Sequence, residues 1–260
     1  MLKALLSTLG IYKIYEKWLW HQIKDKSGPE HIAIILDGNR RWAIESGLEP
    51  WIGHYYGADK IKEVLKWCLD LGVKSVTLYA FSTENFQRPK EEVEKLMQLF
   101  KEKLQEVLES KEIHEYEVKV KVIGRVHLLP LELQEIIRRV EEETKDYNKR
   151  YLNLAIAYGG RAEIVDAAKK IAQKVSRGEL SLEEIDEKVF EQHLYTAFLP
   201  KQDPDLIIRT SGEERLSGFL LYQSAYSELC FLDVYWPEFR RIDLLRAIRT
   251  YQSRKRRFGR

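Results

Sequence analysis

Polar and charged side chains gather where apolar runs of this sequence end. The run HIAIIL stops at Leu36 and is followed at once by DGNRR, which begins with Asp37. Three more apolar runs end in the same way, in STENFQR from Ser82, GGR from Gly159 and RTSGEER from Arg209. Guanidinium groups match phosphate oxygens, and the N–H groups at helix starts attract anions. The four segments therefore predict a binding site for an anion with more than one phosphate group.

The residues of these segments carry carboxylate, amide, guanidinium and hydroxyl groups. Those expected to come together are Asp37, Asn39, Arg40, Arg41, Ser82, Asn85, Arg88, Arg161, Arg209, Ser211, Arg215 and Ser217. For Asp37 alone the simpler interpretation is a helix N-cap, because aspartate is common at that position. Repetition of the pattern behind four apolar runs favours a functional site instead.

Strand-like and helix-like segments alternate along the chain. Apolar stripes at helical spacing cover residues 61–68, which Gly72 follows, and residues 93–108, which Pro89 precedes. Six short runs predict strands, namely IAIIL, SVTLYAF, VKVKVIG, LNLAIAY, DLIIR and ELCFLDV. The alternation predicts an α/β fold: a single domain with a mainly parallel central sheet flanked by helices. Ligands of such sheets bind beyond the carboxyl ends of the strands, where the polar turns fall.

Composition argues against several classes of protein. Charged side chains make up 32% of the 260 residues, but the formal net charge is only +2, which disfavours nucleic acid as a partner. No apolar run reaches the roughly 18 to 20 residues that a membrane span requires. Cys68 and Cys230 each lie in an apolar run and are expected to be buried thiols in a reducing compartment. The expected location is the cytoplasm, including its membrane surface.

Residues 1–30 are expected to form an N-terminal amphipathic helical extension ahead of a main domain over residues 31–260. Such a helix can pack on its own domain, which is the favoured interpretation, or lie at a membrane surface. The side chains that carry the pattern are Leu2, Leu5, Leu6, Leu9, Trp18 and Trp20.

Several familiar catalytic motifs do not occur in the sequence. It contains neither GxxxxGK[ST] nor GxGxxG, and neither a Ser-His-Asp order nor zinc-like spacing of His and Cys. ILDGN is faintly similar to the Asp-x-Asp of phosphohydrolases, but Asn39 replaces the second carboxylate, which argues against an aspartyl-phosphate route. The terminal RKRRFGR would by itself be a solvated basic tail.

Longer motifs resemble a known family from about His31 to the C-terminus. HIAIILDGNRRWA, the GH of Gly53 and His54, YAFSTENFQRP, AYGGR, LIIRTSGEERLSGFLLYQSAYSEL and VYWPEF are similar in order and spacing to the cis-prenyltransferases, the undecaprenyl diphosphate synthase type. The resemblance implies a homodimeric, magnesium-dependent catalytic domain over residues 31–260. It would add isopentenyl diphosphate repeatedly to an allylic diphosphate, either geranylgeranyl or farnesyl diphosphate. The product would be a long-chain polyprenyl diphosphate, the precursor of a glycosyl carrier lipid, released through transient contact with a membrane surface.

The resemblance also implies a role for each matching residue. Asp37, His54 and Asn85 are implied as catalytic, and Asp37 and Glu228 as magnesium ligands, Glu228 in part across the dimer. Because a neutral amide is a poor base, we expect Asn85 to position groups, with a diphosphate oxygen as the proton acceptor. The RFG of residues 257–259 is implied to reach the partner subunit's diphosphate. The implied substrate-binding residues are Gly38, Asn39, Arg40, Arg41, Trp42, Ser82, Thr83, Glu84, Phe86, Arg88, Arg209, Arg215, Leu216 and Ser217.

Four positions depart from the bacterial pattern of this family. Arg40 replaces the second glycine of DGNGRW, which makes the sequence more similar to archaeal and eukaryotic members. Pro50 stands where bacterial members carry an arginine for the allylic diphosphate, so Arg40 is a candidate to replace that contact. Gly218 replaces an asparagine, and Phe86 replaces a tryptophan.

The length of the product is the property that the sequence fixes least. A growing prenyl chain needs an apolar tunnel, and core packing explains the same side chains equally well. The candidates for its wall or floor are Leu96, Leu99, Phe100 and Leu104.

Two other functions remain open on the sequence. A non-catalytic partner subunit of a prenyltransferase complex would lose the essential aspartate and the arginines, yet Asp37, Arg209 and Arg215 are all present. A diphosphate-handling hydrolase could share the arginines, and incubation with an allylic diphosphate alone would distinguish it.

Overall fold

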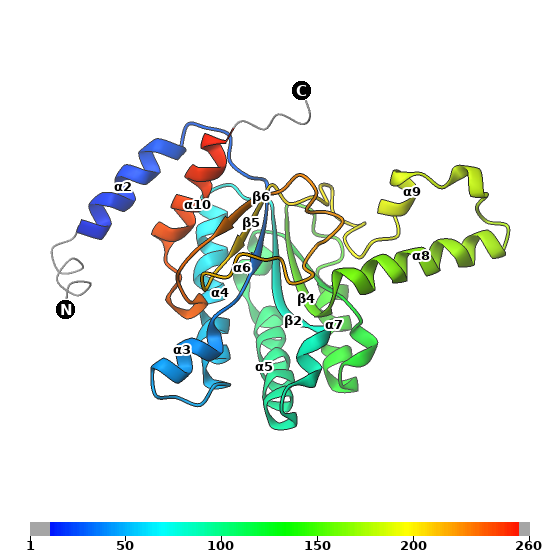
Figure 1. The fold of residues 1–260 in the computed structure, drawn as a ribbon, viewed down its shortest axis with the longest axis horizontal. Helices are drawn as coiled ribbons and strands as arrows, with labels where there is room; N and C mark the ends of the chain where they lie inside the picture. Colours follow the sequence, from blue (N-terminus) through cyan, green and yellow to red (C-terminus); the bar gives the residue numbers. More distant parts are fainter. Residues whose placement is uncertain (1–10, 255–260) are drawn as a thin grey trace. The chain divides into compact units, whose positions relative to one another are not determined.

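Six strands form one sheet in the order β3-β4-β2-β1-β5-β6. The structure is a computed structural model that describes residues 11–254, and Figure 1 shows their helices and strands. The registers of β1 with β5, β5 with β6 and β3 with β4 are all parallel. Every strand overlaps one of the six runs predicted from sequence, and β1, β2 and β4 extend one or two residues beyond their runs. The α/β fold is thereby confirmed. The strands are β1 (His31–Ile35), β2 (Ser75–Ser82), β3 (Val118–Ile123), β4 (Arg150–Tyr158), β5 (Leu206–Arg209) and β6 (Glu228–Phe231).

The described residues divide by their contacts into two compact units. The first holds residues up to 76 together with residues 205–214 and 226–254. The second holds residues 77–204 and 215–225. The single domain predicted over residues 31–260 stays a prediction.

The first unit packs its helices around β1, a strand that is buried along its whole length. Ile32 and Ile34 are fully buried, as expected for a parallel strand covered on both faces. Trp236 is also fully buried and lies in the short 3-10 helix η4 (Trp236–Glu238). The α-helices are α2 (Ile11–Ile23), α3 (Asn39–Glu45), α4 (Ile52–Asp70) and α10 (Arg241–Ser253).

Helix α2 lies against α10, and the two run side by side in Figure 1. Leu19 and Ile23 of α2 are buried, and Glu16 accepts from Arg241 of α10 at 2.8 Å. The described part of the N-terminal extension therefore packs on its own unit. The predicted leucine stripe of residues 2–9 and the tail motif of residues 257–259 lie outside the described residues.

The second unit contains β3, β4 and most of β2. Helix α5 begins directly after Pro89, as predicted, and buries the tunnel candidates Leu96, Leu99 and Leu104 on its packed side. Phe100 is half-buried, with its ring 6.0 Å from that of Phe81. The helices are α5 (Lys90–Glu109), α6 (Lys111–Glu115), α7 (Leu131–Glu143), α8 (Gly160–Ser176) and α9 (Glu187–Glu191), with the 3-10 helices η1 (Thr83–Gln87), η2 (Val126–Leu128) and η3 (Leu182–Glu184).

The outer edge of β3 is covered by polar side chains from or next to α7. The N–H of Val120 donates to the Thr144 hydroxyl at 3.1 Å, and the N–H of Val122 donates to the Glu141 carboxylate at 2.9 Å. Side chains that occupy the N–H groups of an edge strand prevent another strand from pairing there. At the opposite edge, β6 has no outer strand partner among residues 11–254.

Both cysteines are free thiols. Cys68 is buried in α4, and its burial raises the pKa of the thiol to about 12, so the thiol is unreactive at neutral pH. Cys230 in β6 is half-buried, which is less than the sequence suggested.

Glycines allow α3 and α4 to approach each other closely. Gly38 precedes α3 with φ of 99°, and a Cβ at Gly38 would lie 2.6 Å from the Tyr235 ring. A Cβ at Gly57 in α4 would lie 2.3 Å from Oδ1 of Asn39 and 2.9 Å from the Trp236 ring. Trp236 donates its indole N–H to the Gly57 carbonyl at 2.7 Å. The turn after Asp37 and the packing of α4 on Asn39 and Trp236 therefore depend on these close contacts.

We predict that Gly57→Ala lowers the free energy of unfolding by about 1–3 kcal/mol, because the added methyl group overpacks the contact with Asn39 and Trp236. Denaturant unfolding followed by circular dichroism measures the change. Gly28→Ala is the control, since no atom lies within 4 Å of its added Cβ. Equal effects of the two substitutions would contradict the prediction.

Candidate active site

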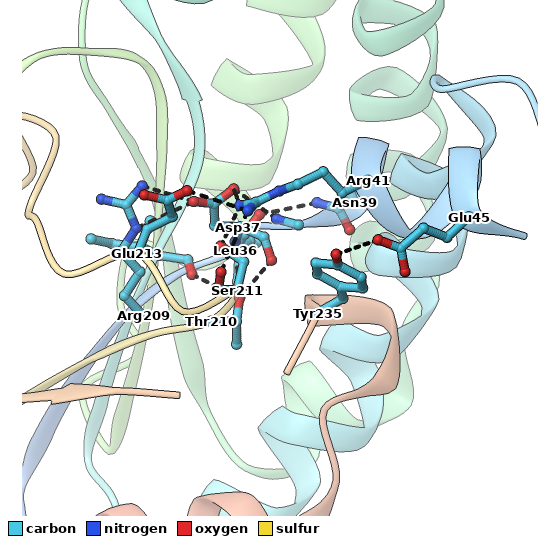
Figure 2. Close-up of polar contacts among 12 residues, drawn as sticks. Leu36, Asp37, Asn39, Arg41, Glu45, Arg209, Thr210, Ser211, Glu213 and Tyr235 are labelled. Atoms are coloured by element: carbon cyan, nitrogen blue, oxygen red, sulfur yellow. Dashed lines mark hydrogen bonds and ion pairs between the residues drawn. The ribbon is translucent and has the colours of Figure 1, made fainter. Parts of the chain in front are cut away.

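An ion pair between Asp37 and Arg209 joins the ends of β1 and β5 (Figure 2). In the ladder of β1 with β5, Ile35 lies opposite Arg209. Asp37 comes two residues after Ile35, and its N–H donates to the Ile35 carbonyl at 2.9 Å. Arg209 donates to Oδ2 of Asp37 through Nη2 at 2.7 Å and through Nε at 3.3 Å. Only 4% of Arg209 is exposed, and this carboxylate offsets the charge of its buried guanidinium.

The surroundings of Asp37 favour its ionised form. Burial by itself would raise the pKa of Asp37. Hydrogen bonding and charge from Arg209, with further hydrogen bonds from Ser211 and the N–H of Gly38, outweigh burial and hold this pKa below its ordinary value of 3.8. Asp37 is therefore a carboxylate at neutral pH, the form that a hard cation such as Mg²⁺ binds.

Arg41 reaches back from the first turn of α3 to the same place. Its Nη2 donates to the Ser211 hydroxyl at 2.6 Å and lies 3.4 Å from Oδ1 of Asp37. Its Nη1 pairs with Glu213 at 3.3 Å, and its guanidinium lies 5.6 Å from the centre of the Tyr235 ring. The side chain stays 42% exposed, so Arg41 is oriented by its neighbours and still open to an anion.

The loop after β5 is tied closely to the backbone of Asp37. The Thr210 hydroxyl donates to the Asp37 carbonyl at 2.7 Å and accepts from the Asp37 N–H at 3.1 Å. Ser211 has φ of 80°, a left-handed conformation that few side chains adopt, and its N–H donates to the Val234 carbonyl at 2.8 Å. The Trp236 N–H donates to the Asp37 carbonyl as well. Residues in such backbone conformations cluster at functional sites.

Asp37 does not act as an N-cap in the usual sense. Its Oδ1 accepts from the N–H of Gly38 at 2.7 Å, whereas an N-cap side chain accepts from the second or third residue of the helix. The N-cap residue of α3 is Gly38, which has no side chain to cap the helix. The carboxylate is directed at Arg209 and Arg41 instead.

Other predicted residues of the first unit lie on α3 and α4. Asn39 begins α3 and donates from its amide to the Leu36 carbonyl at 3.0 Å, while Arg40 is exposed. The Trp42 ring lies 4.7 Å from that of Tyr56. His54 is half-buried in the first turn of α4.

The loop after β2 forms a second group of predicted residues. Oδ1 of Asn85 accepts from the Ser82 N–H at 2.9 Å and closes a reciprocal cap around η1, which also contains Thr83 and Glu84. The engaged amide oxygen supports a positioning role for Asn85. Phe86 packs edge-on against Phe81 at 4.9 Å.

Arg88 ends the loop after β2 and is oriented by a buried carboxylate. Its Nη1 pairs with Glu92 at 3.0 Å, and Glu92 is only 7% exposed. A buried partner of this kind restricts the guanidinium to one direction.

Arg215, Leu216 and Ser217 lie in the loop over residues 215–225, which joins a buried polar network through Gln223. Glu163 at the start of α8 is 1% exposed and accepts from the Tyr158 hydroxyl, the Tyr195 N–H and the Gln223 amide. Gln223 also donates to the Thr196 hydroxyl at 2.9 Å. The network therefore connects the end of β4 with residues 195–196 and with the far end of this loop.

Glu228 lies away from Asp37 within this chain. The ladder pairs Glu228 with Leu206 at the start of β5, whereas Arg209 at its end pairs with Phe231, and three residues of strand span about 10 Å. The Glu228 carboxylate accepts from Arg254 at 2.5 Å. Within residues 11–254 no group of three or more His, Cys, Asp or Glu side chains could hold a metal ion.

Three contributors to the site were not predicted as site residues. Thr210 and Glu213 stood in RTSGEER and Tyr235 in VYWPEF, next to residues that were named. The position of Tyr235 could not be predicted from the sequence, because the path of the chain after β6 is what brings this residue close to Asp37.

Comparison with known proteins assigns the chain to a family. The prenyltransferase family model described as undecaprenyl diphosphate synthase matches residues 35–259. The chain belongs to this family. A relative from Methanocaldococcus jannaschii is 59% identical over 98% of this chain and 91% of its own, and one from Methanopyrus kandleri is 58% identical over 98% and 93%. Both are named tritrans,polycis-undecaprenyl-diphosphate synthase (geranylgeranyl-diphosphate specific).

Solved structures of the same family share the fold. Lavandulyl diphosphate synthase from Lavandula x intermedia, in complex with dimethylallyl diphosphate, gives a TM-score of 0.84 at 39% identity, over 90% of this chain and 99% of that one. A probable undecaprenyl diphosphate synthase from Campylobacter jejuni gives a TM-score of 0.73 at 33% identity, over 90% and 100%. The resemblance seen in the sequence, including its archaeal character, is confirmed. The protein is a prenyltransferase that condenses isopentenyl diphosphate with an allylic diphosphate.

We predict that Glu163 makes stability fall as the pH rises. Burial raises the pKa of Glu163 above its ordinary value of 4.5, although Tyr158, Tyr195 and Gln223 donate to it. A raised pKa adds stability below the pKa of the unfolded state, and this contribution is lost as the pH rises through the pKa of the folded state. Glu163→Gln lacks the titrating group, so the melting temperature of the native protein should fall relative to this variant as the pH is raised from acid towards neutral. Parallel pH profiles of the two proteins would contradict the prediction.

Proposed function

We propose that this enzyme extends geranylgeranyl diphosphate by repeated cis addition of isopentenyl diphosphate to a polyprenyl diphosphate of about undecaprenyl length, the precursor of a glycosyl carrier lipid. The names of relatives at 50–59% identity support the primer and the length. The observation that carries the proposal is the ionised Asp37 held between Arg209 and Arg41 at the strand ends. The alternative primer is farnesyl diphosphate. An assay in which the two primers compete would show which one the enzyme prefers.

The residues around Asp37 fit a magnesium ion that is shared with a diphosphate. Mg²⁺ commonly uses one or two carboxylates and takes its other ligands from substrate phosphates and water. Asp37 supplies one ionised carboxylate, and Glu228 of the same chain is directed elsewhere. A bound Mg²⁺ would offset the charge that gathers on the departing diphosphate.

Side chains of the site would stabilise the negative charge that develops on the departing diphosphate and would assist the transfer of the proton. The bond between C1 of the allylic substrate and its diphosphate oxygen breaks, C1 bonds to isopentenyl diphosphate, and a proton lost from the latter restores a double bond. Arg41, aimed by Ser211 and Glu213, would stabilise the departing diphosphate together with His54. Asn85 would position groups for the proton transfer, with a diphosphate oxygen as acceptor.

The remaining predicted residues would bind the two substrates. Arg209, Arg215 and Ser217 would hold isopentenyl diphosphate, and Arg40, exposed on α3, is the candidate to supply the contact missing at Pro50. The other residues proposed to contact substrate are Gly38, Asn39, Trp42, Ser82, Thr83, Glu84, Phe86, Arg88 and Leu216.

The two edges of the sheet differ in whether side chains occupy their N–H groups, and this difference supports a homodimer. The N–H groups of Val120 and Val122 on β3 are occupied by side chains of Thr144 and Glu141. The edge at β6 carries Glu228, the residue expected to act in part across the dimer. A second copy of the chain would therefore meet the β6 side.

We predict that Asp37→Ala reduces incorporation of radiolabelled isopentenyl diphosphate into long lipid by roughly 10²–10³-fold, the size expected for loss of a charge that acts on the transition state. The native protein should incorporate label with geranylgeranyl diphosphate in the presence of Mg²⁺ and lose this activity with EDTA. Asp25→Ala is the control, because its carboxylate is 83% exposed and lies 3.9 Å from Lys24, which is not a residue of the site.

Three results would contradict the proposal. Near-normal turnover of Asp37→Ala would remove Asp37 from the mechanism, and no incorporation with any allylic primer would point to a non-catalytic partner subunit. Release of diphosphate from the allylic substrate at the same rate without isopentenyl diphosphate would favour a hydrolase.

The surface of α2 and α10 supports transient contact with an anionic membrane. Arginines of α10 and its N-cap lie over aromatic rings of α2 at 4.9–5.9 Å, in the pairs Arg240–Tyr12, Arg246–Tyr15, Arg249–Trp18 and Arg241–Trp20. Ile14 is 69% exposed and Trp18 43% exposed beside them. Aromatic and basic side chains together are typical of helices that lie at a membrane interface. No helix within residues 11–254 is long and apolar enough to cross a bilayer.

We predict that Ile14→Glu weakens sedimentation with vesicles that contain anionic lipid by about tenfold, because it adds a negative charge and removes an apolar contact at the interface. Leu182→Glu is the matched control, since Leu182 is also 69% exposed and lies in η3 of the second unit. Equal binding of the two variants, or no binding of the native protein, would contradict membrane contact through α2.

A further inference from the structure

The segment that follows Arg215 has a backbone that needs support from its neighbours. Ser217, Gly218 and Leu220 have φ values of 48°, 78° and 45°. Side chains other than glycine rarely adopt this left-handed conformation. Contacts from the rest of the second unit must therefore keep Ser217 and Leu220 in place.

Tyr79 of β2 contacts this segment through both its hydroxyl and its ring. The hydroxyl donates to the Ser217 carbonyl at 3.3 Å, and the Tyr158 carbonyl lies slightly farther away at 3.5 Å. The ring stacks on Phe219, with ring centres 4.7 Å apart and planes 7° apart. Tyr79 is 9% exposed and Phe219 is fully buried, so water competes little for these contacts.

Two successive carbonyl groups of the segment are held in this way. Tyr79 holds the Ser217 carbonyl, and the N–H of Gly160 at the start of α8 donates to the Gly218 carbonyl at 2.7 Å. Fixing both peptide groups orients the Cα–Cβ bond of Ser217 and so limits the positions that its hydroxyl can reach to the three staggered rotamers. Tyr79 also stands three residues before Ser82 on β2, so one strand sets both this segment and the turn that contains Asn85.

We propose that Tyr79 is a positioning residue for isopentenyl diphosphate, which acts by holding the Ser217 carbonyl and so directing the Ser217 hydroxyl. The inference rests on the proposed binding of isopentenyl diphosphate by Ser217. It assigns a substrate-specific effect to a side chain that reaches the ligand only through Ser217. Removal of the Tyr79 hydroxyl should consequently affect one substrate and leave the other unchanged.

The test is the KM of each substrate in Tyr79→Phe, which keeps the stacked ring and removes only the hydroxyl. The KM for isopentenyl diphosphate should rise about three- to tenfold, the effect of one lost hydrogen bond, with kcat and the KM for the allylic diphosphate changed less than about twofold. Tyr147→Phe is the matched control in the same unit. It removes a hydroxyl that lies 2.8 Å from Nδ1 of His114, and it should change neither KM.

A double variant separates positioning from a general structural effect. If Tyr79 acts through the Ser217 hydroxyl, Tyr79→Phe should add almost nothing to the KM once Ser217→Ala is present. An equal rise of KM in both backgrounds, or parallel changes for both substrates and kcat, would overturn the inference. A raised KM in Ser217→Ala with none in Tyr79→Phe would refute only the role of Tyr79. An unchanged KM in Ser217→Ala would instead refute the proposed role of Ser217 itself, and the inference with it.

Discussion

The ion pair between Asp37 and Arg209 is the interaction on which the site of the first unit depends. Loss of one partner from a buried ion pair costs about 3–5 kcal/mol, because it leaves the other charge uncompensated. The pair therefore stabilises the strand ends and at the same time keeps a carboxylate ionised and fixed in direction. Arg41 and Ser211 lie beside that carboxylate, whereas Thr210 bonds the backbone of Asp37 and so fixes where the side chain begins.

The second unit uses a different means to hold its functional loops. A buried carboxylate, Glu163, accepts three hydrogen bonds and ties the start of α8 to the chain at Tyr195 and Gln223. A buried polar group stabilises a structure only when its hydrogen bonds are made, and this requirement makes such a network specific for one loop conformation. The left-handed residues of the segment at Ser217 can persist because the surrounding contacts leave few alternatives.

Much of the fold could be predicted from the sequence, because it follows from periodicity. The apolar run that begins at Ile32 lies in β1, which is buried along its whole length, and α5 begins directly after Pro89, as the fixed φ of proline suggests. The pairing of Asp37 with the turn after Arg209 could be predicted too, since the ends of parallel strands share one edge. The support given by Thr210 and Tyr235 could not, because it depends on the exact ladder register and on the path of the chain after β6. The left-handed conformation of Ser211 likewise arises from tertiary contacts that no local pattern records.

The two edges of the sheet limit how copies of this chain can assemble. Strand pairing between molecules needs unpaired N–H groups, and on β3 those of Val120 and Val122 already have partners. The outer edge of β6 has no strand partner among the described strands, and the side chain of Arg254 donates to the Leu229 carbonyl of β6 at 3.3 Å. An association through strands would therefore use this same edge of both molecules and close on itself. Growth of longer arrays would require two open edges per molecule. The side chains of Thr144 and Glu141 thus act as a stop against fibre formation, which matters most for a chain rich in β-branched strands.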